Sequence, residues 1–440
     1  MALTQEEYKP KLNALIADIN SKFIERDELA RILVLTVFSK QHIFLIGEPG
    51  VGKTDITSTI ASMIRNTTFW EKVVDYDTKK HELFGDASIP YLELDKSETI
   101  LGNHFVFLDE MFKAPSEPLN ACLPVMNERV FQDKGKKHKV DLLSMFGASN
   151  EMPHGEKIAP FDDRLIFRYD VLRIQKPENF IRFAKKDFDT SRVLNVQFDI
   201  EDLDFVGAQS KLLNVDDFFF TEFNNLKMKI VQSSIKVSDR KFGRAIDILR
   251  VSAFLNNRQT MDYSDFFILN HIAWSKIEEK KRIKKITYEY CFSSKDEIDA
   301  VLIGGQKEFK KLEGEMQEQL ADFLNYNFSQ DDFGQVLEFK FNVLVDTTTD
   351  SFLKQIEKIC EPFFKIQERK KFADMVAEQI SNNIFVPDVK DRTFTVDIVS
   401  QYEGTVSNLG RVYEKIKQWS EDNKDYFSFQ QHCLLNSKRS

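Results

Sequence analysis

The stretch Gly47-Glu48-Pro49-Gly50-Val51-Gly52-Lys53-Thr54 decides the fold of this 440-residue chain. It fits the phosphate-loop pattern G-x-x-x-x-G-K-[ST] at every fixed position. The glycines let the backbone turn back on itself, so that successive N–H groups point at a phosphate chain. Lys53 supplies a mobile positive charge for the β- and γ-phosphates, and Thr54 offers a hydroxyl group to Mg²⁺. Together with Asp55, the next residue, this loop forms the predicted set of nucleotide contacts.

The residues on either side of the loop match what a phosphate site requires. The run His42-Ile43-Phe44-Leu45-Ile46 before it is typical of a short buried strand, and Ile56, Ile60, Met63 and Ile64 after it fall on one face of a helix. A strand, a glycine turn and a helix N-terminus together form an anion site. The alternative is a chance glycine turn, which this context disfavours. We therefore predict a nucleoside triphosphate site here.

A second run, His104-Phe105-Val106-Phe107-Leu108, is continuously apolar and ends in Asp109-Glu110. Such a run fits a parallel strand that is buried on both faces, and acids at its carboxyl end lie where open α/β sheets bind ligands. Asp109 would hold Mg²⁺ through water, and Glu110 would orient and deprotonate the attacking water. The alternative is a solvated loop, but the phosphate loop upstream favours the catalytic interpretation.

Asn150 ends a further strand-like run over residues 141–150. On a strand beside the one that carries Asp109, its amide would reach the γ-phosphate or the attacking water. The alternative for such an Asn is a turn former. Between these strands, a helix is expected over residues 117–127 and a basic turn over residues 132–139. Earlier in the chain, a strand is expected at residues 73–76 and a hairpin-like stretch over residues 91–103.

The segment Phe161-Asp162-Asp163-Arg164-Leu165-Ile166-Phe167-Arg168 places two arginines near an apolar strand. An arginine at a domain edge is usually part of a surface salt bridge. Here it is also a candidate finger that reaches the nucleotide of a neighbouring subunit. Arg164, Arg168 and Arg129 all remain candidates for that role.

Composition limits the class of protein. A net charge of −9 argues against extensive wrapping of nucleic acid, although the basic runs at residues 134–139 and 280–285 leave local contact open. The four cysteines are far apart, as in reduced cytosolic proteins. The N-terminus lacks the pattern of a signal peptide, and no apolar run approaches about 20 residues. We expect a soluble, cytoplasmic protein without a membrane span.

The second half of the chain is organised differently. A helical pattern runs over about residues 215–277. Apolar residues at helical spacing favour a helical stalk over residues 278–330 and 400–440. Between these two parts, alternating runs at 337–345 and 394–398 predict a small α+β insert over residues 331–399, which is a plausible platform for a partner.

The order of these motifs resembles the MoxR family of AAA+ ATPases, and its RavA branch in particular. The loop GEPGVGKT, the strand FVFLDE, NERVF, GASNE, FDDRLIFR and Ser238-Asp239-Arg240 carry the resemblance, over about residues 1–275. It implies an α/β fold: an AAA+ P-loop core that binds the nucleotide at residues 1–195, in which helices sandwich a parallel sheet, with an α-helical lid over residues 196–277. It also implies a C-terminal helical stalk with an α+β insert.

The resemblance further implies roles for single residues. Asn150 would be sensor 1 and Arg164 the trans-acting finger, while Arg240 would be the sensor 2 arginine that touches the γ-phosphate; Lys241 is an alternative for the last role. ATP with Mg²⁺ would bind between the subunits of a hexameric ring. ATP is favoured over GTP because no Asn-Lys-x-Asp or Thr-Lys-x-Asp motif follows the loop. Adenine would pack near Ile24 and Glu25.

Three functions are weighed on this basis. The first is an ATP-hydrolysing ring that remodels or activates a protein partner, which in this family is often a von Willebrand factor A domain protein. The second is a nucleic-acid-stimulated motor or defence-system ATPase, for which Lys134, Lys136, Lys137 and Lys139 would supply the contacts. The third is a nucleotide-gated scaffold with negligible turnover.

Overall fold

The computed structural model describes residues 3–86, 89, 93–133, 135–152, 159–292, 368 and 371–387. The chain divides into two compact units, the first formed by Met1–Tyr290 with Glu378–Asp388 and the second by Cys291–Ala377 with Val389–Ser440. The predicted stalk beyond residue 292 and most of the predicted insert lie outside the described residues, as do Lys134, Cys360 and Cys433. The phosphate loop, the acids after it and the candidate arginines all belong to the first unit.

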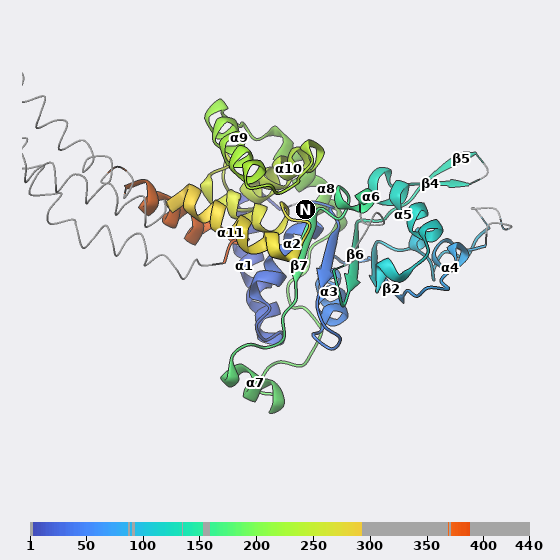
Figure 1. Ribbon diagram of the computed structural model, residues 1–440. Helices are drawn as coiled ribbons and strands as arrows, with labels where there is room; N and C mark the ends of the chain where they lie inside the picture. Colours follow the sequence, from blue (N-terminus) through green and yellow to red (C-terminus); the bar gives the residue numbers. More distant parts are fainter. Residues whose placement is uncertain are drawn as a thin grey trace, which may run out of the picture. The chain divides into compact units, whose positions relative to one another are not determined.

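A five-stranded parallel sheet forms the centre of this unit (Figure 1). Its strands are β1 (Ile43–Ile46), β2 (Phe69–Val73), β3 (Phe105–Asp109), β6 (Ser144–Ser149) and β7 (Phe167–Asp170). They are arranged in the order β2-β3-β6-β1-β7. Every residue of β1 and β6 is buried, as expected for parallel strands covered on both faces. We call the edge of the sheet where the strands end the carboxyl edge, and the edge where they begin the amino edge.

Helices flank the sheet, as the sequence predicted. They are α1 (Gln5–Lys22), α2 (Asp27–Phe38), α3 (Lys53–Ala61), α4 (Lys80–Phe84), α5 (Ser116–Glu128), α6 (Ala159–Asp162) and α7 (Pro177–Ala184), with the 3₁₀ turns η1 (Ile100–Gly102) and η2 (Met111–Lys113). Alternating helices and buried parallel strands confirm the predicted AAA+-like α/β core.

Two predictions of local structure were wrong, and a third was correct in part. A strand was expected at residues 73–76. The structure has β2 at Phe69–Val73 instead, because the pairing with β3 runs from Phe69 to Val73. The described part of the expected hairpin, residues 93–103, holds η1 and turns but no strand. The basic residues expected in a turn lie in a hairpin, in which β5 (Lys136–Lys139) pairs antiparallel with β4 (Val130–Asp133), so a chain reversal is confirmed but is shorter than the turn expected over residues 132–139. Here a positive φ at Gly135 permits a tighter reversal than the pattern suggested.

The lid is helical, as predicted. It consists of α8 (Ile200–Gln209), η3 (Ser210–Leu212), α9 (Asp217–Gln232), α10 (Asp239–Leu255), η4 (Tyr263–His271) and α11 (Ile277–Phe292). The basic run of α11 is tied to the core, because Lys280 pairs with Asp170 at 3.1 Å and Lys284 pairs with Glu28 at 3.1 Å. Among the described helices, none is long and apolar enough to cross a membrane.

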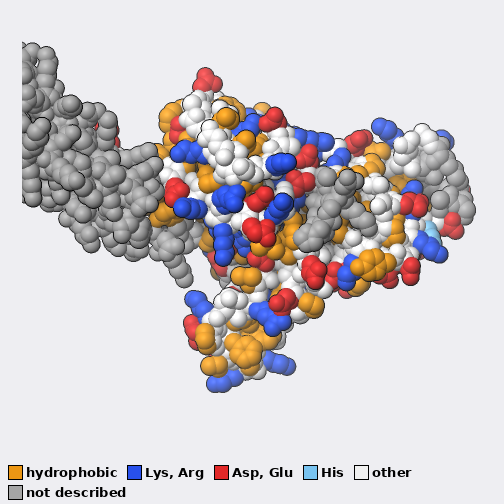
Figure 2. All heavy atoms as spheres, viewed as in Figure 1, with side chains coloured by type: hydrophobic (Ala, Val, Ile, Leu, Met, Phe, Trp, Pro, Cys, Tyr) orange, Lys and Arg blue, Asp and Glu red, His pale blue; other side chains and the backbone are white. Residues whose placement is uncertain are grey.

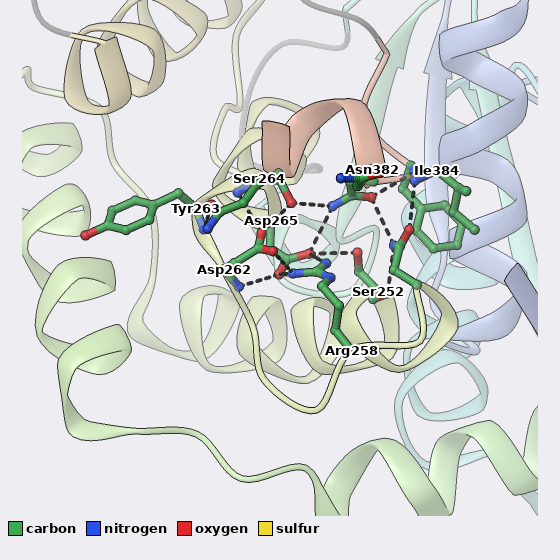
Figure 3. A network of polar contacts seen from close by, with 12 residues as sticks. Ser252, Arg258, Asp262, Tyr263, Ser264, Asp265, Asn382 and Ile384 are labelled. Atoms are coloured by element: carbon green, nitrogen blue, oxygen red, sulfur yellow. Dashed lines mark hydrogen bonds and ion pairs between the residues drawn. The ribbon is translucent and has the colours of Figure 1, made fainter. Parts of the chain in front are cut away.

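Residues 378–387 return to this unit from far along the chain. Figure 3 shows the polar network that holds them: buried Asn383 donates to Ser264 Oγ at 2.9 Å and accepts from Asn256 Nδ2 at 3.1 Å. Phe385, two residues further on, is also buried, and Arg31 of α2 donates to the carbonyl oxygen of Ile384. The segment thus joins the core to the lid, whereas the sequence pattern assigned it to the insert.

Candidate nucleotide-binding site

The phosphate loop lies at the carboxyl edge, between β1 and α3. Gly50 and Gly52 have φ values of 78° and 81°, in the left-handed region that glycine adopts without strain. At Gly47 an added Cβ would lie 2.5 Å from the carbonyl oxygen of Val171, so only glycine fits there. Gly52 is the N-cap of α3, and the free N–H groups of that helix therefore open onto the loop. This backbone is suited to an anion.

Lys53 points back across the loop. It is 6% exposed, and its Nζ donates to the carbonyl oxygens of Gly47 and Glu48 and, at 3.1 Å, to Oδ1 of Asn150. Burial lowers the pKa of Lys53, and the carboxylates of Asp109 and Glu110 oppose this shift. The Lys53 ammonium group is hydrogen-bonded to uncharged oxygen atoms and lies near two carboxylates. It can therefore rotate toward a phosphate while the two carboxylates continue to stabilise its charge.

The two acids follow β3 as predicted. Glu110 has a φ of 55°, which is rare for a residue with a side chain, and its N–H donates to Oδ1 of Asp109 at 3.0 Å. Glu110 is only 7% exposed. Its carboxylate accepts a hydrogen bond from Ser149 Oγ at 3.5 Å and forms an ion pair with Lys113 Nζ at 3.5 Å. The turn therefore sends two adjacent carboxylates in fixed directions from the end of one strand.

Strand order brings these groups together. Because β6 lies between β1 and β3, Asn150 at its end lies between the phosphate loop and the two acids. Thr54 lies in the first turn of α3, directly after Lys53. A threonine hydroxyl group and a nearby carboxylate are hard oxygen donors, and a site with few protein ligands suits Mg²⁺, which keeps several waters and phosphate oxygens. The residues present therefore fit Mg²⁺.

Residues outside the motif also shape the site, and sequence reasoning missed them. Arg26 Nη2 donates to the carbonyl oxygen of Val51 at 3.0 Å and so braces the loop. Ser149 Oγ donates a hydrogen bond to the Glu110 carboxylate. The sequence could have indicated this residue, because it directly precedes Asn150. The carboxylate of Glu25, a residue expected near adenine, accepts from the N–H groups of Gln175 and Lys176.

Two of the three candidate finger arginines are held by several hydrogen bonds within the subunit. Arg168 is bonded to Asp162 and to the carbonyl oxygen of Trp274. Arg129 donates to the carbonyl oxygens of Lys40 at 2.7 Å and Leu143 at 3.0 Å, which precede β1 and β6 at the amino edge. Arg164 is partly exposed, and its described hydrogen bond is to the carbonyl oxygen of Pro160. Arg168 is therefore buried, whereas Arg129 and Arg164 are both partly exposed, and Arg129 is the more extensively hydrogen-bonded of these two.

Arg240 lies near Arg164 rather than near Lys53. Arg240 Nη2 donates to Asn127 Oδ1 at 2.8 Å, and Asn127 lies in the last turn of α5, close to Arg129 and the amino edge. Its helix, α10, is joined to the loop before β7 by the hydrogen bond from Ser238 Oγ to Asp163 Oδ1 at 2.5 Å. In Figure 1, α6 and α10 lie toward the top and α3 lies toward the bottom. The structure thus groups Arg164 with Arg240 at one edge, and Lys53, Asp109 and Asn150 at the other.

Comparison with known proteins assigns the family. Residues 10–184 match the family model described as the MoxR domain in the MoxR–vWA–beta-propeller ternary systems, and residues 220–287 match an AAA lid domain. An uncharacterized protein of Methanocaldococcus jannaschii, MJ0079, is 32% identical over 289 residues, which are 64% of this chain and 75% of the relative. The chain belongs to the MoxR family of AAA+ ATPases.

A more distant relative agrees with membership of the MoxR family, and a solved structure shares the fold. Chaperone MoxR1 of Mycobacterium tuberculosis is 25% identical over 171 residues, which are 36% of this chain and 44% of the relative. The crystal structure of a candidate ATPase from Cytophaga hutchinsonii superposes with a TM-score of 0.52 at 15% identity, and covers 64% of this chain and 94% of that one. This second likeness shows a shared fold. In this MoxR-family protein the core and the lid therefore have the expected AAA+ form.

Proposed function

We propose that this AAA+ ATPase hydrolyses ATP as a hexameric ring of the MoxR type and uses the energy to remodel or activate a protein partner. The observation that carries the proposal is the hydrogen bond between Lys53 and Asn150, which joins the phosphate loop to the strand beside Asp109 and Glu110. A phosphate-binding ammonium group, an amide and two carboxylates that converge at one edge of a parallel sheet make up a phosphoryl-transfer site.

Each residue would have a distinct part in hydrolysis. The backbone N–H groups of residues 47–55, other than Pro49, and the Lys53 ammonium group would hold the phosphates, and Asn150 would orient the γ-phosphate and the attacking water. Glu110 would accept the proton of that water. Thr54 and Asp109 would hold Mg²⁺, which would supply charge neutralisation on the β- and γ-phosphates.

The arginines would act on the nucleotide of a neighbouring copy. Arg164 and Arg240 share the amino edge, whereas their own phosphate loop lies at the carboxyl edge. A second copy that presents its amino edge to this loop would therefore supply both cations to the transition state. For Arg240, this differs from a sensor that touches the phosphate of its own subunit.

The partner would be a protein with a von Willebrand factor A domain. This is supported by the description of the matched family, whose MoxR domain occurs in systems with such a protein. The name of the mycobacterial relative, a chaperone, is also consistent with remodelling of a protein.

The decisive experiment replaces Glu110 by Gln in the full chain. We expect the Glu110→Gln variant to bind ATP as the unmodified chain does and to lose about 100-fold or more of its turnover, because the base is absent. Glu117→Gln, which alters an exposed acid on α5, is the matched control and should keep its turnover. Capture of proteins on the ATP-loaded Glu110→Gln variant then tests the partner. If the unmodified, assembled chain shows no turnover, a nucleotide-gated scaffold is the correct alternative.

A nucleic-acid-stimulated motor is the second candidate, and one observation favours it. Lys136, Lys137 and Lys139 lie exposed on the projecting β4–β5 hairpin. Stimulation of ATPase activity by DNA or RNA that falls steeply with salt, and that is lost when these three lysines become Gln, would support it.

A further inference from the structure

Helix α7 exposes its apolar side chains. None of its residues is buried, and Phe180 and Ile181 are 59% and 52% exposed. Phe183 and the nearby Leu172 are exposed to a similar degree. Figure 1 shows α7 standing apart from the helices that cover the sheet, and Figure 2 shows hydrophobic atoms gathered at that place with Lys and Arg atoms around them. We call Leu172, Phe180, Ile181 and Phe183 the α7 surface. An apolar cluster of this kind usually marks an interface.

The backbone that carries the α7 surface is held in place. The carboxylate of Glu25 accepts from the N–H groups of Gln175 at 2.6 Å and Lys176 at 2.9 Å, directly before the helix. After the helix, Asp189 forms an ion pair with the buried Lys22, and its N–H donates to the carbonyl oxygen of Ser21 at 3.1 Å. The exposure of the α7 surface is therefore a property of an anchored element.

The same segment borders the nucleotide site. Arg173, just before α7, forms an ion pair with Glu48 of the phosphate loop. Arg192, after α7, lies 3.7 Å from Asp55 in the first turn of α3. The α7 surface is thus linked through ion pairs to both flanks of the loop that receives the triphosphate.

From this position we propose that the α7 surface binds a second copy of this chain, namely the copy whose Arg164 and Arg240 face the adjoining nucleotide. This inference rests on the proposed trans arrangement, and it adds a contact that the arrangement does not specify. Because those arginines lie at the far edge of their own sheet, the copy that supplies them must approach the edge that α7 borders.

The approaching face of that second copy suits the α7 surface. Lid helix α9 lies beside Arg240, since Lys227 pairs with Asp239 at 2.6 Å. At the start of α9, Phe218 is 62% exposed and follows Asp216 and Asp217. The α7 segment, in turn, surrounds its apolar side chains with cations: Arg173, Lys176, Arg182, Lys185 and Lys186. Apolar contact with opposite charges around it favours such a pair of surfaces.

The test combines Phe180→Ser and Ile181→Ser in one chain, the α7 variant, and compares it with a control that combines Phe180→Leu and Ile181→Val. Both α7 residues are more than half exposed, so the replacement leaves the fold intact. The control changes the same two positions but keeps them apolar. Self-association of the full chain is measured by sedimentation velocity with Mg²⁺ and a non-hydrolysable ATP analogue. We expect the α7 variant to associate at least about tenfold more weakly than the control while it binds the nucleotide equally well. Equal association of the two variants would overturn the proposal.

A cross-linking experiment tests the identity of the bound molecule. Benzoylphenylalanine introduced at position 181 of the full chain should, on illumination, give a covalent dimer whose linked peptide comes from α9. The proposal would be overturned if the cross-link formed only within one chain. It would also be overturned if the α7 variant lost binding to phosphatidylserine vesicles while its self-association stayed unchanged. Association is read without turnover. If the chain assembles through α7 but never hydrolyses ATP, the proposed ATPase function is rejected and the α7 contact is retained. If the chain hydrolyses ATP but the α7 variant self-associates as the control does, only the α7 contact is rejected.

Discussion

The ammonium group of Lys53 donates a 3.1 Å hydrogen bond to Oδ1 of Asn150, a residue 97 positions later in the chain. The contact exists because β6 pairs with β1, so that Ile46 and Ser149 lie side by side at the carboxyl edge. A phosphate that enters the loop would exchange one of the oxygen partners of Lys53 for its own oxygens. Asn150 would then be at hydrogen-bond distance from both the lysine and the γ-phosphate.

Replacement of Asn150 by Ala should therefore affect chemistry more than binding. The loop N–H groups and Lys53 remain, so the dissociation constant for ATP should change by less than about threefold. The catalytic rate constant should fall by about 10- to 100-fold, as when one positioned donor is removed. Steady-state ATPase assays combined with fluorescent-nucleotide titration measure the two quantities. Ser149→Ala is an informative neighbour, because its hydroxyl group contacts Glu110 and not Lys53. A large loss of binding in Asn150→Ala would contradict this assignment.

Mixing two inactive chains tests whether the arginines act between copies. Lys53→Ala damages the phosphate loop, and Arg164→Ala damages the amino edge. In a trans arrangement, an equimolar mixture regains up to about a quarter of normal activity, because some interfaces join an intact loop to an intact arginine. A chain that carries both changes, mixed with inactive Lys53→Ala, should regain none. Absence of recovery in the first mixture would show that Arg164 serves its own subunit. Arg240→Ala can replace Arg164→Ala in the same design.

Asn383 should be important for stability, unlike its neighbour Asn382. Asn383 is buried, and its amide forms hydrogen bonds with Ser264 and Asp265 of the lid and with Asn256, which follows α10. Asn383→Ala leaves these groups without a partner, at a cost of about 2–4 kcal/mol in the free energy of unfolding. Asn382→Ala should cost less than about 0.5 kcal/mol, because its exposed side chain can be lost while its carbonyl oxygen still accepts from Lys9. Urea denaturation compares the two variants, and similar midpoints would refute the role of this network.

Lys241 should make stability depend on pH. Burial, together with the charge of Arg168, lowers the pKa of Lys241 to about 7 against the opposing attraction of Asp162. Between about pH 7 and the ordinary lysine pKa near 10.4, the unfolded chain binds a proton that the folded chain does not, so this group makes stability rise with pH.

In Lys241→Met the slope of unfolding free energy against pH over that range should fall by at most about 1.4 kcal/mol per pH unit. Lys236→Met, which changes an exposed lysine of the lid, should leave the slope unchanged. Urea unfolding at pH 7, 8.5 and 9.5 gives the slopes. An identical slope in the two variants would rule out this role for Lys241.

Much of the nucleotide site was predictable from sequence because its chemistry is local. The loop from Gly47 to Thr54 needs glycines at fixed spacing, and a buried strand that ends in Asp109 and Glu110 is recognisable from its composition. Asn150 was predicted on a neighbouring strand, and the pairing of β6 with β3 confirms that placement. The parallel sheet and the helical lid likewise follow from the alternation of apolar periods.

The position of Arg240 could not be predicted in this way. Its motif, Ser238-Asp239-Arg240, predicts the start of a helix, and Ser238 indeed caps α10. Which edge of the sheet this helix start meets depends on how the lid packs, and no local pattern reports it. The same holds for residues 378–387, whose Ile384 accepts from Arg31 across 353 positions of chain.

The sequence by itself therefore determined the phosphate loop, the acids after β3 and the alternation of strands and helices, since backbone propensity and apolar periodicity act over a few residues. Tertiary structure alone decided that Arg164 and Arg240 share the edge opposite Lys53, that α7 shows its apolar face to solvent, and that Asn383 binds the distant segment 378–387 to the lid. These relations depend on packing and hydrogen bonds between segments far apart in the chain, where many arrangements satisfy the same local pattern.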